Sequence, residues 1–278
     1  MTGLQSAAKQ HRLAVHVGIH EPISVKITGD TIPPATGPGK VSEALKGAAT
    51  TAGAGDDEDG KTTTKLYNRT IWINEDGTLN AAGTYDKLHL FDYPAAGLRE
   101  SSSTQAGSSL TPPFDTPVGR LGSLICFDLR FPEPSLALAR PGPASPWSAT
   151  PAQLLAYPSA FTVPTGRAHW EALLRARAIE CGAWVVAAAQ VGRHDTSDPD
   201  SGENRKGKRV SYGHSMVVDP WGKVVLELGG FEAKGEGAED GPDTWEAKEG
   251  AVGQLGIVDV DLGQWESVRE KMPLLRRT

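Results

Sequence analysis

Cys126 is the residue of this sequence best placed to act as a nucleophile. It ends the apolar run 118–126, which predicts a buried strand, and the pattern of 131–140 predicts a helix a few residues later. A helix N-terminus carries a partial positive charge that favours a reactive thiolate. The backbone N–H groups of the turn 126–130 also offer a place to hold an oxyanion. A small buried hydrophobe at the end of a strand explains the position of this cysteine equally well.

Lys87 and Glu100 are the other candidates for a reaction centre. Lys87 follows residues 84–86 at the end of a predicted strand, and His89, two residues on, shares the same face. A lysine beside a thiolate and a carboxylate would stabilise developing negative charge. Taken by itself, however, Lys87 is better explained as a solvated lysine at a sheet edge. Glu100 follows the loop 92–99, where a surface acid is the simplest interpretation.

Metal binding and the common hydrolase or nucleotide motifs are not supported. His16 and His20 share one face of a predicted strand, but no third ligand lies nearby in the sequence. The sequence has no G-x-S-x-G motif and no P-loop. Its two cysteines, Cys126 and Cys181, are too few for a disulfide scaffold or a four-ligand zinc site. Cys181 falls on an apolar helix stripe, which predicts a core position.

Charge and composition narrow the class of protein. The net charge of −6 over 278 residues argues against non-specific nucleic-acid binding. No apolar run approaches the roughly 18–20 residues of a membrane span, and residues 1–9 lack the apolar stretch of a secretory signal. The low cysteine content favours a reducing compartment, and we expect a cytoplasmic protein. Glycine (32) and proline (20) are abundant, so we expect a core interrupted by flexible segments.

The hydrophobic pattern predicts one domain, 1–278, of the α/β class with mixed sheets. Strands are predicted at 13–19, 69–74, 79–90, 118–126, 153–157, 183–190, 214–218, 223–228 and 255–260. Helices are predicted at 3–11, 131–140 and 168–181, the last with Trp170, Leu173, Leu174, Ala178 and Cys181 on one stripe. We expect disordered insertions at 28–61, 141–151, 194–209 and 229–250.

Five ordered motifs of this sequence resemble the nitrilase superfamily of carbon–nitrogen hydrolases. They are YDKLHLFD at 85–92, LICFDLRFPE at 124–133, YPSAF at 157–161, HWEALLRARAIE at 169–180 and YGHSMVVDPWG at 212–222. The resemblance runs from about Leu4 to the C-terminus apart from the insertions.

The resemblance implies an αββα four-layer sandwich that forms a homodimer. It implies that Cys126 attacks an amide carbonyl to form a thioester, while Lys87 and the backbone N–H of Phe127 hold the oxyanion. Glu100 matches the family's second glutamate, which orients the lysine. Phe161 and Thr162 would line the acyl pocket. This chemistry needs no metal and no organic cofactor.

The motifs also bear on the substrate. Phe127-Asp128 after the nucleophile is the amidase-like form, whereas nitrilases proper usually carry Trp-Glu there. The helix motif is most similar to the branch that hydrolyses deaminated glutathione, so we expect a small linear amide of that kind. Two alternatives stay open: an ω-amidase for α-keto acid amides, and an inactive homologue that binds or scaffolds. Arg130 either holds a substrate carboxylate or pairs with Asp128 or Glu133.

One departure from the family pattern concerns the general base. The family places that glutamate in a Pro-Glu pair at the end of the second strand, well before the catalytic lysine. Residues 4–21 already match the helix and strand that follow it, so we expect an N-terminally incomplete copy of an active amidase, lacking one strand–helix–strand unit. Pro132-Glu133 matches a different family position, and Glu21 lies after the third strand, which makes it a poor substitute.

Overall fold

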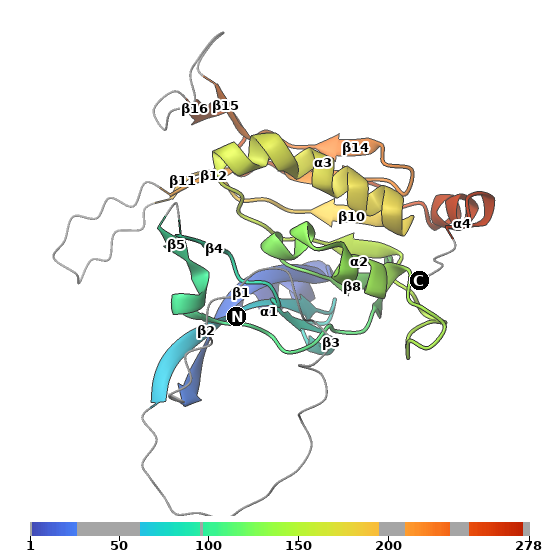
Figure 1. Ribbon diagram of the computed structural model, residues 1–278, viewed down its shortest axis with the longest axis horizontal. Coiled ribbons are helices and arrows are strands. Elements are labelled where there is room, and N and C mark those ends of the chain that lie inside the picture. The colour runs from blue at the N-terminus through green and yellow to red at the C-terminus, as the bar shows by residue number, and fades with distance from the viewer. Residues whose placement is uncertain (1, 27–61, 95–96, 195–208, 234–244, 275–278) are drawn as a thin grey trace, which may run out of the picture.

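The computed structural model describes residues 2–26, 62–94, 97–194, 209–233 and 245–274, and its α/β fold contains two stacked sheets (Figure 1). Its helices are α1 (Thr2–His11), η2 (Glu100–Ser102), η3 (Cys126–Arg130), α2 (Pro132–Ala139), α3 (Val163–Cys181) and α4 (Leu262–Lys271). Its longer strands are β1 (Val15–Lys26), β2 (Thr62–Ile73), β3 (Leu79–Asp86), β8 (Gly119–Ser123), β10 (Trp184–Ala187), β11 (Val191–His194), β12 (Arg209–Tyr212) and β14 (Val224–Glu227). The shorter strands are β4 (Asp92–Tyr93), β5 (Leu98–Arg99), β6 (Thr104–Gln105), β7 (Phe114–Thr116), β9 (Leu154–Ala156), β13 (Met216–Val218), β15 (Phe231–Ala233) and β16 (Trp245–Ala247).

The first sheet joins β1, β2 and β3 in antiparallel order, and β6 pairs with β2 in parallel. Alternation along β2 sends Ile71 and Ile73 to the face that α1 covers, where they pack with Ala8. Trp72, between them, points to the opposite face, where it packs with residues of the second sheet. The first sheet is therefore apolar on both sides and lies between α1 and the second sheet.

The second sheet has the order β14-β13-β10-β9-β8-β7. Its centre consists of the parallel strands β8, β9 and β10. Strands β9 and β10 are largely buried and have continuous apolar sequences, whereas β8 is buried only over its last three residues. One face meets the first sheet through a cluster that includes Trp72, Phe114, Leu121, Leu154 and Trp184. This packing determines how the two sheets sit against each other.

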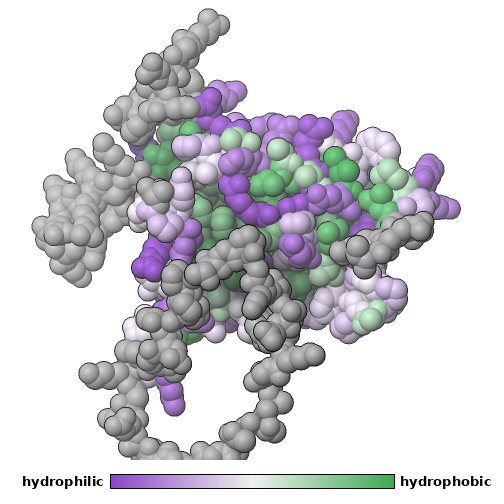
Figure 2. Space-filling view, viewed as in Figure 1, coloured by the Kyte–Doolittle hydropathy of each residue, from purple (hydrophilic) through white to green (hydrophobic). Residues whose placement is uncertain are grey.

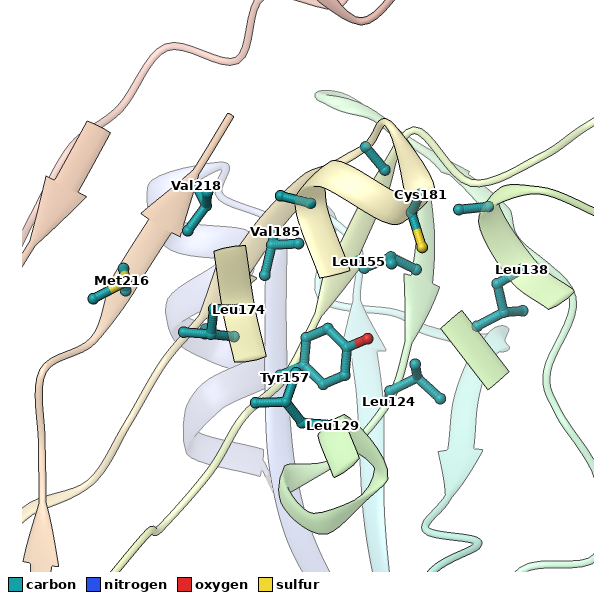
Figure 3. Packing of buried hydrophobic residues seen from close by; sticks show 14 of the residues in the cluster. Leu124, Leu129, Leu138, Leu155, Tyr157, Leu174, Cys181, Val185, Met216 and Val218 are labelled. Carbon is teal, nitrogen blue, oxygen red and sulfur yellow. The ribbon is translucent and has the colours of Figure 1, made fainter. Parts of the chain in front are cut away.

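Helices α2 and α3 cover the outer face of the second sheet. Figure 3 shows Leu138 of α2 and Leu174 and Cys181 of α3 directed toward Leu155 and Val185 of the strands. The layer order is thus helix, sheet, sheet, helix, and the expected αββα sandwich is confirmed. Cys181 is fully buried, as its place on the apolar stripe of the predicted helix indicates. Burial raises the pKa of its thiol to about 12.

Helix α3 begins five residues earlier than its periodicity predicts. Pro164 lies in its first turn, a position where a missing N–H costs nothing. The helix ends where Gly182 takes a left-handed conformation, with φ of 53°. Trp170 and Leu174 are buried, as expected, and Figure 2 shows polar and apolar residues interspersed over the visible face. None of the helices in the described ranges is long and apolar enough to cross a membrane.

The prediction of a strand at 255–260 is wrong. Its side chains do alternate, with Val258 and Val260 packed against the cluster between the sheets and Leu255 and Ile257 exposed. The backbone, however, pairs with no strand in the described part of the chain. Helix α4 follows instead, and the Asp261 carboxylate caps it by accepting the N–H of Gln264.

The predicted insertion 141–151 is a series of turns packed on α2, and not a disordered segment. The Trp147 indole N–H donates to the carbonyl of Ala137 at 2.7 Å, and backbone hydrogen bonds close turns at Ser145, Ser148 and Thr150. The predicted insertion at 28–61 and residues 195–208 of the one at 194–209 lie outside the described residues. In the predicted insertion 229–250, residues 234–244 lie outside as well. The described remainder is not disordered, because β15 and β16 pair there in antiparallel order.

His16 joins the two sheets and predicts a pH dependence of stability. Its Nε2 lies 3.0 Å from the Ser123 hydroxyl, and burial lowers the His16 pKa from 6.5 to about 4. The folded state therefore holds a neutral imidazole, while the unfolded chain takes up a proton below pH 6.5. The stability present above pH 6.5 should fall as the pH drops toward 4, by on the order of 2–3 kcal/mol from this residue.

Urea unfolding at several pH values between 4 and 7 tests this expectation. His16→Gln should flatten the fall in stability, because glutamine takes up no proton. His11→Gln, on the exposed end of α1, is the matched control and should keep the slope of the parent. Equal slopes for the parent and His16→Gln would refute the assignment.

Candidate active site

A cavity of about 1310 Å³ opens where the parallel strands of the second sheet end. Cys126, Pro158 and Ala188 lie after β8, β9 and β10, respectively, and all three line this cavity. Residues of the first sheet and its loops, including Lys87 and Glu100, line it as well. In open α/β sheets, ligands bind in the crevice outside the carboxyl ends of the strands. The structure therefore brings all three predicted reactive residues to one cavity.

Cys126 lies at a sharp turn between β8 and η3. Its φ of 48° is left-handed, a conformation that costs a residue with a side chain about 1–2 kcal/mol. Its N–H donates to the carbonyl of Pro158 at 3.1 Å, and the N–H of Asp128 donates to Ile125 at 3.0 Å. The helix that follows the thiol directly is the five-residue η3, and α2 begins only at Pro132.

Lys87 is a buried cation held by Glu100. It follows β3 directly, and its side chain is only 3% exposed. The Nζ group donates to Glu100 Oε2 at 2.6 Å, in an ion pair whose acid is 18% exposed. The interpretation of Lys87 as a solvated edge residue is therefore wrong, and so is that of Glu100 as a plain surface acid.

The Glu100 carboxylate is fully engaged by its neighbours. Oε2 also accepts the backbone N–H of Phe91 at 2.6 Å, and Oε1 accepts from the Asn68 amide at 3.1 Å. Burial raises the Glu100 pKa, but Lys87 and these hydrogen bonds outweigh it, so that the pKa lies below its usual value. The group is ionised at neutral pH and its geometry suits the holding of Lys87.

The remaining predicted residues divide between the cavity and its surroundings. Thr162 lines the cavity, just before α3. Phe161 does not: its ring is buried and packs against Trp170 with centroids 4.8 Å apart. Arg130 donates to Nδ1 of His169 at 3.0 Å and lies over the Phe161 ring, so it is not among the described lining residues either.

Phe127 directs its ring away from the reacting groups. The ring packs between Phe91 and Phe131, with centroids 5.1 and 5.6 Å away. This leaves the backbone, and not the side chain, of Phe127 as the part next to the Cys126 thiol.

Three lining residues were not predicted to belong to the site. Asn68 lies on the inward face of β2 and reaches Glu100, while Arg99 and Gln190 line the cavity from β5 and from the end of β10. Asn68 directly precedes the predicted strand 69–74, and the other two residues lie near strand ends, so none of the three carries a sequence signal for the site. The described residues form no group of three or more His, Cys, Asp or Glu that would hold a metal ion.

The strained turn at Cys126 predicts an unusual ranking of two variants. Glycine accepts a positive φ without the cost that alanine has, so Cys126→Gly should be more stable than Cys126→Ala by up to about 1 kcal/mol. The matched pair is Cys181→Gly and Cys181→Ala inside α3, where glycine should be the less stable by about 1 kcal/mol. Urea unfolding of the four variants measures both differences, and the same sign in both pairs would contradict the strained turn.

Comparison with known proteins agrees with the fold and the motifs. The family model described as Carbon-nitrogen hydrolase matches residues 29–270. A deaminated glutathione amidase of Bos taurus is 42% identical over 222 residues, which cover 79% of this chain and 55% of that protein. The crystal structure of the Caenorhabditis elegans NitFhit protein matches with a TM-score of 0.60 and 34% identity, covering 98% of this chain and 48% of that one.

A second solved structure belongs to a named branch of the superfamily. Saccharomyces cerevisiae Nit3, described as a member of branch 10 of the nitrilase superfamily, matches with a TM-score of 0.52 and 33% identity over 77% of this chain and 60% of that one. The chain spans about half the length of the curated relatives it matches. With a family model matched over most of its length, the chain belongs to the carbon–nitrogen hydrolase family, and the resemblance to the nitrilase superfamily is confirmed.

Proposed function

We propose that this protein is a thiol-dependent amidase that hydrolyses a small linear amide to its carboxylic acid. One observation supports this above the others: Cys126, on a strained turn, and the buried Lys87–Glu100 pair open into the same cavity. A nucleophile next to a fixed cation is what acyl transfer through a tetrahedral intermediate requires.

In the proposed first step, the Cys126 thiolate attacks the amide carbonyl carbon. The carbonyl oxygen takes the negative charge, which Lys87 and the N–H of Phe127 stabilise. The N–H groups on either side of Phe127 already donate to carbonyls of Pro158 and Ile125, so that of Phe127 is the one assigned to the oxyanion. The C–N bond then breaks, and the departing nitrogen takes up a proton. It leaves as ammonia from a primary amide, or as a free amine from a substituted amide such as deaminated glutathione, and a thioester remains. Water cleaves the thioester and restores the thiol.

Glu100 is assigned to the support of Lys87 and not to proton transfer. It is the one carboxylate among the described lining residues, and its two oxygens accept hydrogen bonds from Lys87, Phe91 and Asn68. The proton acceptor for the thiol is assigned to the preceding glutamate that the family resemblance implies.

The charges of the cavity favour an amide that also carries a carboxylate. Glu100 neutralises the charge of Lys87. Arg99 is the other lysine or arginine among the described lining residues. Asp92 lies opposite Arg99 in the β4–β5 pair and attracts it electrostatically, while its carboxylate oxygens accept the N–H and hydroxyl of Ser101 at 3.0 and 2.6 Å. Deaminated glutathione, the substrate named for the bovine relative, is an amide with carboxylate groups and fits this pattern.

Trapping of the thioester tests the proposed chemistry. The chain, extended at its N-terminus by the strand–helix–strand unit that carries the family's glutamate, is the parent of this test. It is incubated with deaminated glutathione or an α-keto acid ω-amide, with and without hydroxylamine. Its intact mass and the released amine or ammonia are measured. The parent should form an acyl adduct that hydroxylamine removes, and Cys126→Ala should form none. Cys181→Ala, which alters a buried core thiol, is the control and should trap like the parent.

Each outcome of this experiment has a clear meaning. Trapping that survives Cys126→Ala would show the nucleophile to be another residue. If the parent carries the family's glutamate and still forms no adduct and releases no amine or ammonia with any amide of the panel, the amidase proposal is overturned in favour of a non-catalytic binding role. Faster reaction of the α-keto acid amide than of deaminated glutathione would instead identify an ω-amidase.

Arg99 should determine the preference for anionic amides. Arg99→Gln is expected to lower kcat/KM for a monoamide of a dicarboxylic acid by about tenfold or more, the effect of losing one hydrogen bond to a charged group. The methyl ester of the same monoamide should be hydrolysed by parent and variant alike. Arg12→Gln, an exposed change after α1, is the control. An equal loss on both substrates would show that Arg99 does not contact the carboxylate.

A further inference from the structure

Asp128 is a fully buried carboxylate with four hydrogen bonds. Oδ2 accepts from the Tyr85 hydroxyl at 2.8 Å and from the N–H of Ile125 at 3.0 Å. Oδ1 accepts the backbone N–H of His89 at 3.0 Å and lies 2.7 Å from the His89 ring Nδ1. Each oxygen thus accepts one backbone N–H and contacts one polar side chain inside the core.

These donors come from the two segments that carry the reacting groups. Tyr85 and His89 flank Lys87 on either side at a spacing of two residues, and Ile125 directly precedes Cys126. The two segments are about 40 residues apart in the sequence and belong to different sheets. Asp128 therefore bridges the lysine segment and the turn of the nucleophile within one cluster of hydrogen bonds.

Neighbouring contacts make this bridge rigid. The Tyr85 hydroxyl also accepts the N–H of Leu88 at 3.2 Å, and burial together with Asp128 raises the Tyr85 pKa well above its usual value, which keeps the hydroxyl a donor. The His89 ring stacks on Phe131 with centroids 3.9 Å apart. The buried guanidinium of Arg177 donates to the carbonyl of Leu129 at 3.0 Å and ties η3 to α3.

We propose that Asp128 is a positioning residue that fixes the separation between the Lys87 ammonium and the Cys126 thiol. The proposal rests on the proposed function, since that separation matters only if both groups act on one carbonyl. An error of about 1 Å in such an alignment is enough to slow a reaction by around 10²-fold. The bridge acts on both reacting groups through the backbone, without touching the substrate.

Asparagine cannot replace Asp128 without loss. Each carboxylate oxygen accepts one backbone N–H, that of Ile125 or that of His89. Whichever way the amide of an asparagine at this position is turned, its NH₂ group faces one of these N–H donors and leaves it without an acceptor. One of the two segments should therefore shift, although the side chain keeps its size.

The experiment compares two reactions of the same thiol. Acylation by a p-nitrophenyl ester passes through an oxyanion and needs Lys87 in place, whereas alkylation by iodoacetamide displaces iodide and forms no oxyanion. Asp128→Asn should lower the acylation rate of Cys126 by about 30-fold or more relative to its alkylation rate. Tyr85→Phe removes one of the four donors and should lower this ratio about threefold to tenfold.

Ser135→Ala is the matched control. Its hydroxyl is also fully buried, lies 2.6 Å from the Tyr157 hydroxyl, and sits in α2 just beyond the same turn, but contacts neither segment. It should lower thermal stability while leaving the ratio of the two rates at the value of the parent. A purely structural role of Asp128 would give the same pattern as this control.

The outcomes separate this proposal from the proposed function. A folded Asp128→Asn variant whose ratio stays within twofold of the parent overturns the positioning role. If that variant does not fold, Tyr85→Phe decides, and an unchanged ratio there overturns the role as well. Failure of the chain to hydrolyse any amide once the family's N-terminal glutamate is supplied, with acylation by the ester intact, would count against the amidase proposal and leave the test of Asp128 valid.

Discussion

The burial of one ammonium group determines the path of the chain around the site. The side chain of Lys87 is 3% exposed, and a charge so removed from water is destabilising unless a counter-charge and hydrogen bonds compensate. Glu100 supplies the counter-charge, so the chain must turn back within 13 residues of the lysine. The β4–β5 hairpin makes this turn, and β6 fixes the segment that follows by pairing with β2 next to Asn68. The ion pair and the loop architecture therefore depend on each other.

The reacting groups are divided between two layers. The thiol belongs to the sheet under α2 and α3, and the lysine belongs to the sheet over α1. Their relative placement depends on the packing between the sheets, which includes Trp72 and Trp184, and on the polar contacts of His16 and Asp128. A shift between the sheets would separate the Cys126 thiol from the Lys87 ammonium. The packing of the core therefore also fixes the geometry of the proposed reaction centre.

The sequence predicts the elements and the central residues of the site better than the directions of its side chains. Periodicity correctly places Trp170 and Cys181 inside α3, and the motifs correctly bring Cys126, Lys87 and Glu100 together. Phe161 lies in a loop and Arg130 ends the five-residue η3, where no periodicity fixes a side-chain direction, and neither residue lines the cavity. The segment 255–260 shows that alternation predicts faces but not a pairing partner. The contacts of Asp128 depend on residues about 40 positions away, which no local pattern reveals.

The two cysteines differ in burial, so the number of thiols that a reagent can reach reports whether the chain is folded. Cys181 is shielded by α2, α3 and the sheet beneath them, with its thiol kept protonated by a pKa of about 12, while Cys126 opens into the cavity. In the native state a thiol-specific dye can therefore reach one sulfur, and in the unfolded chain it can reach two. The number of dye molecules bound per chain reports the unfolded fraction of a preparation directly, and one fluorophore can be attached at the cavity without removing a cysteine.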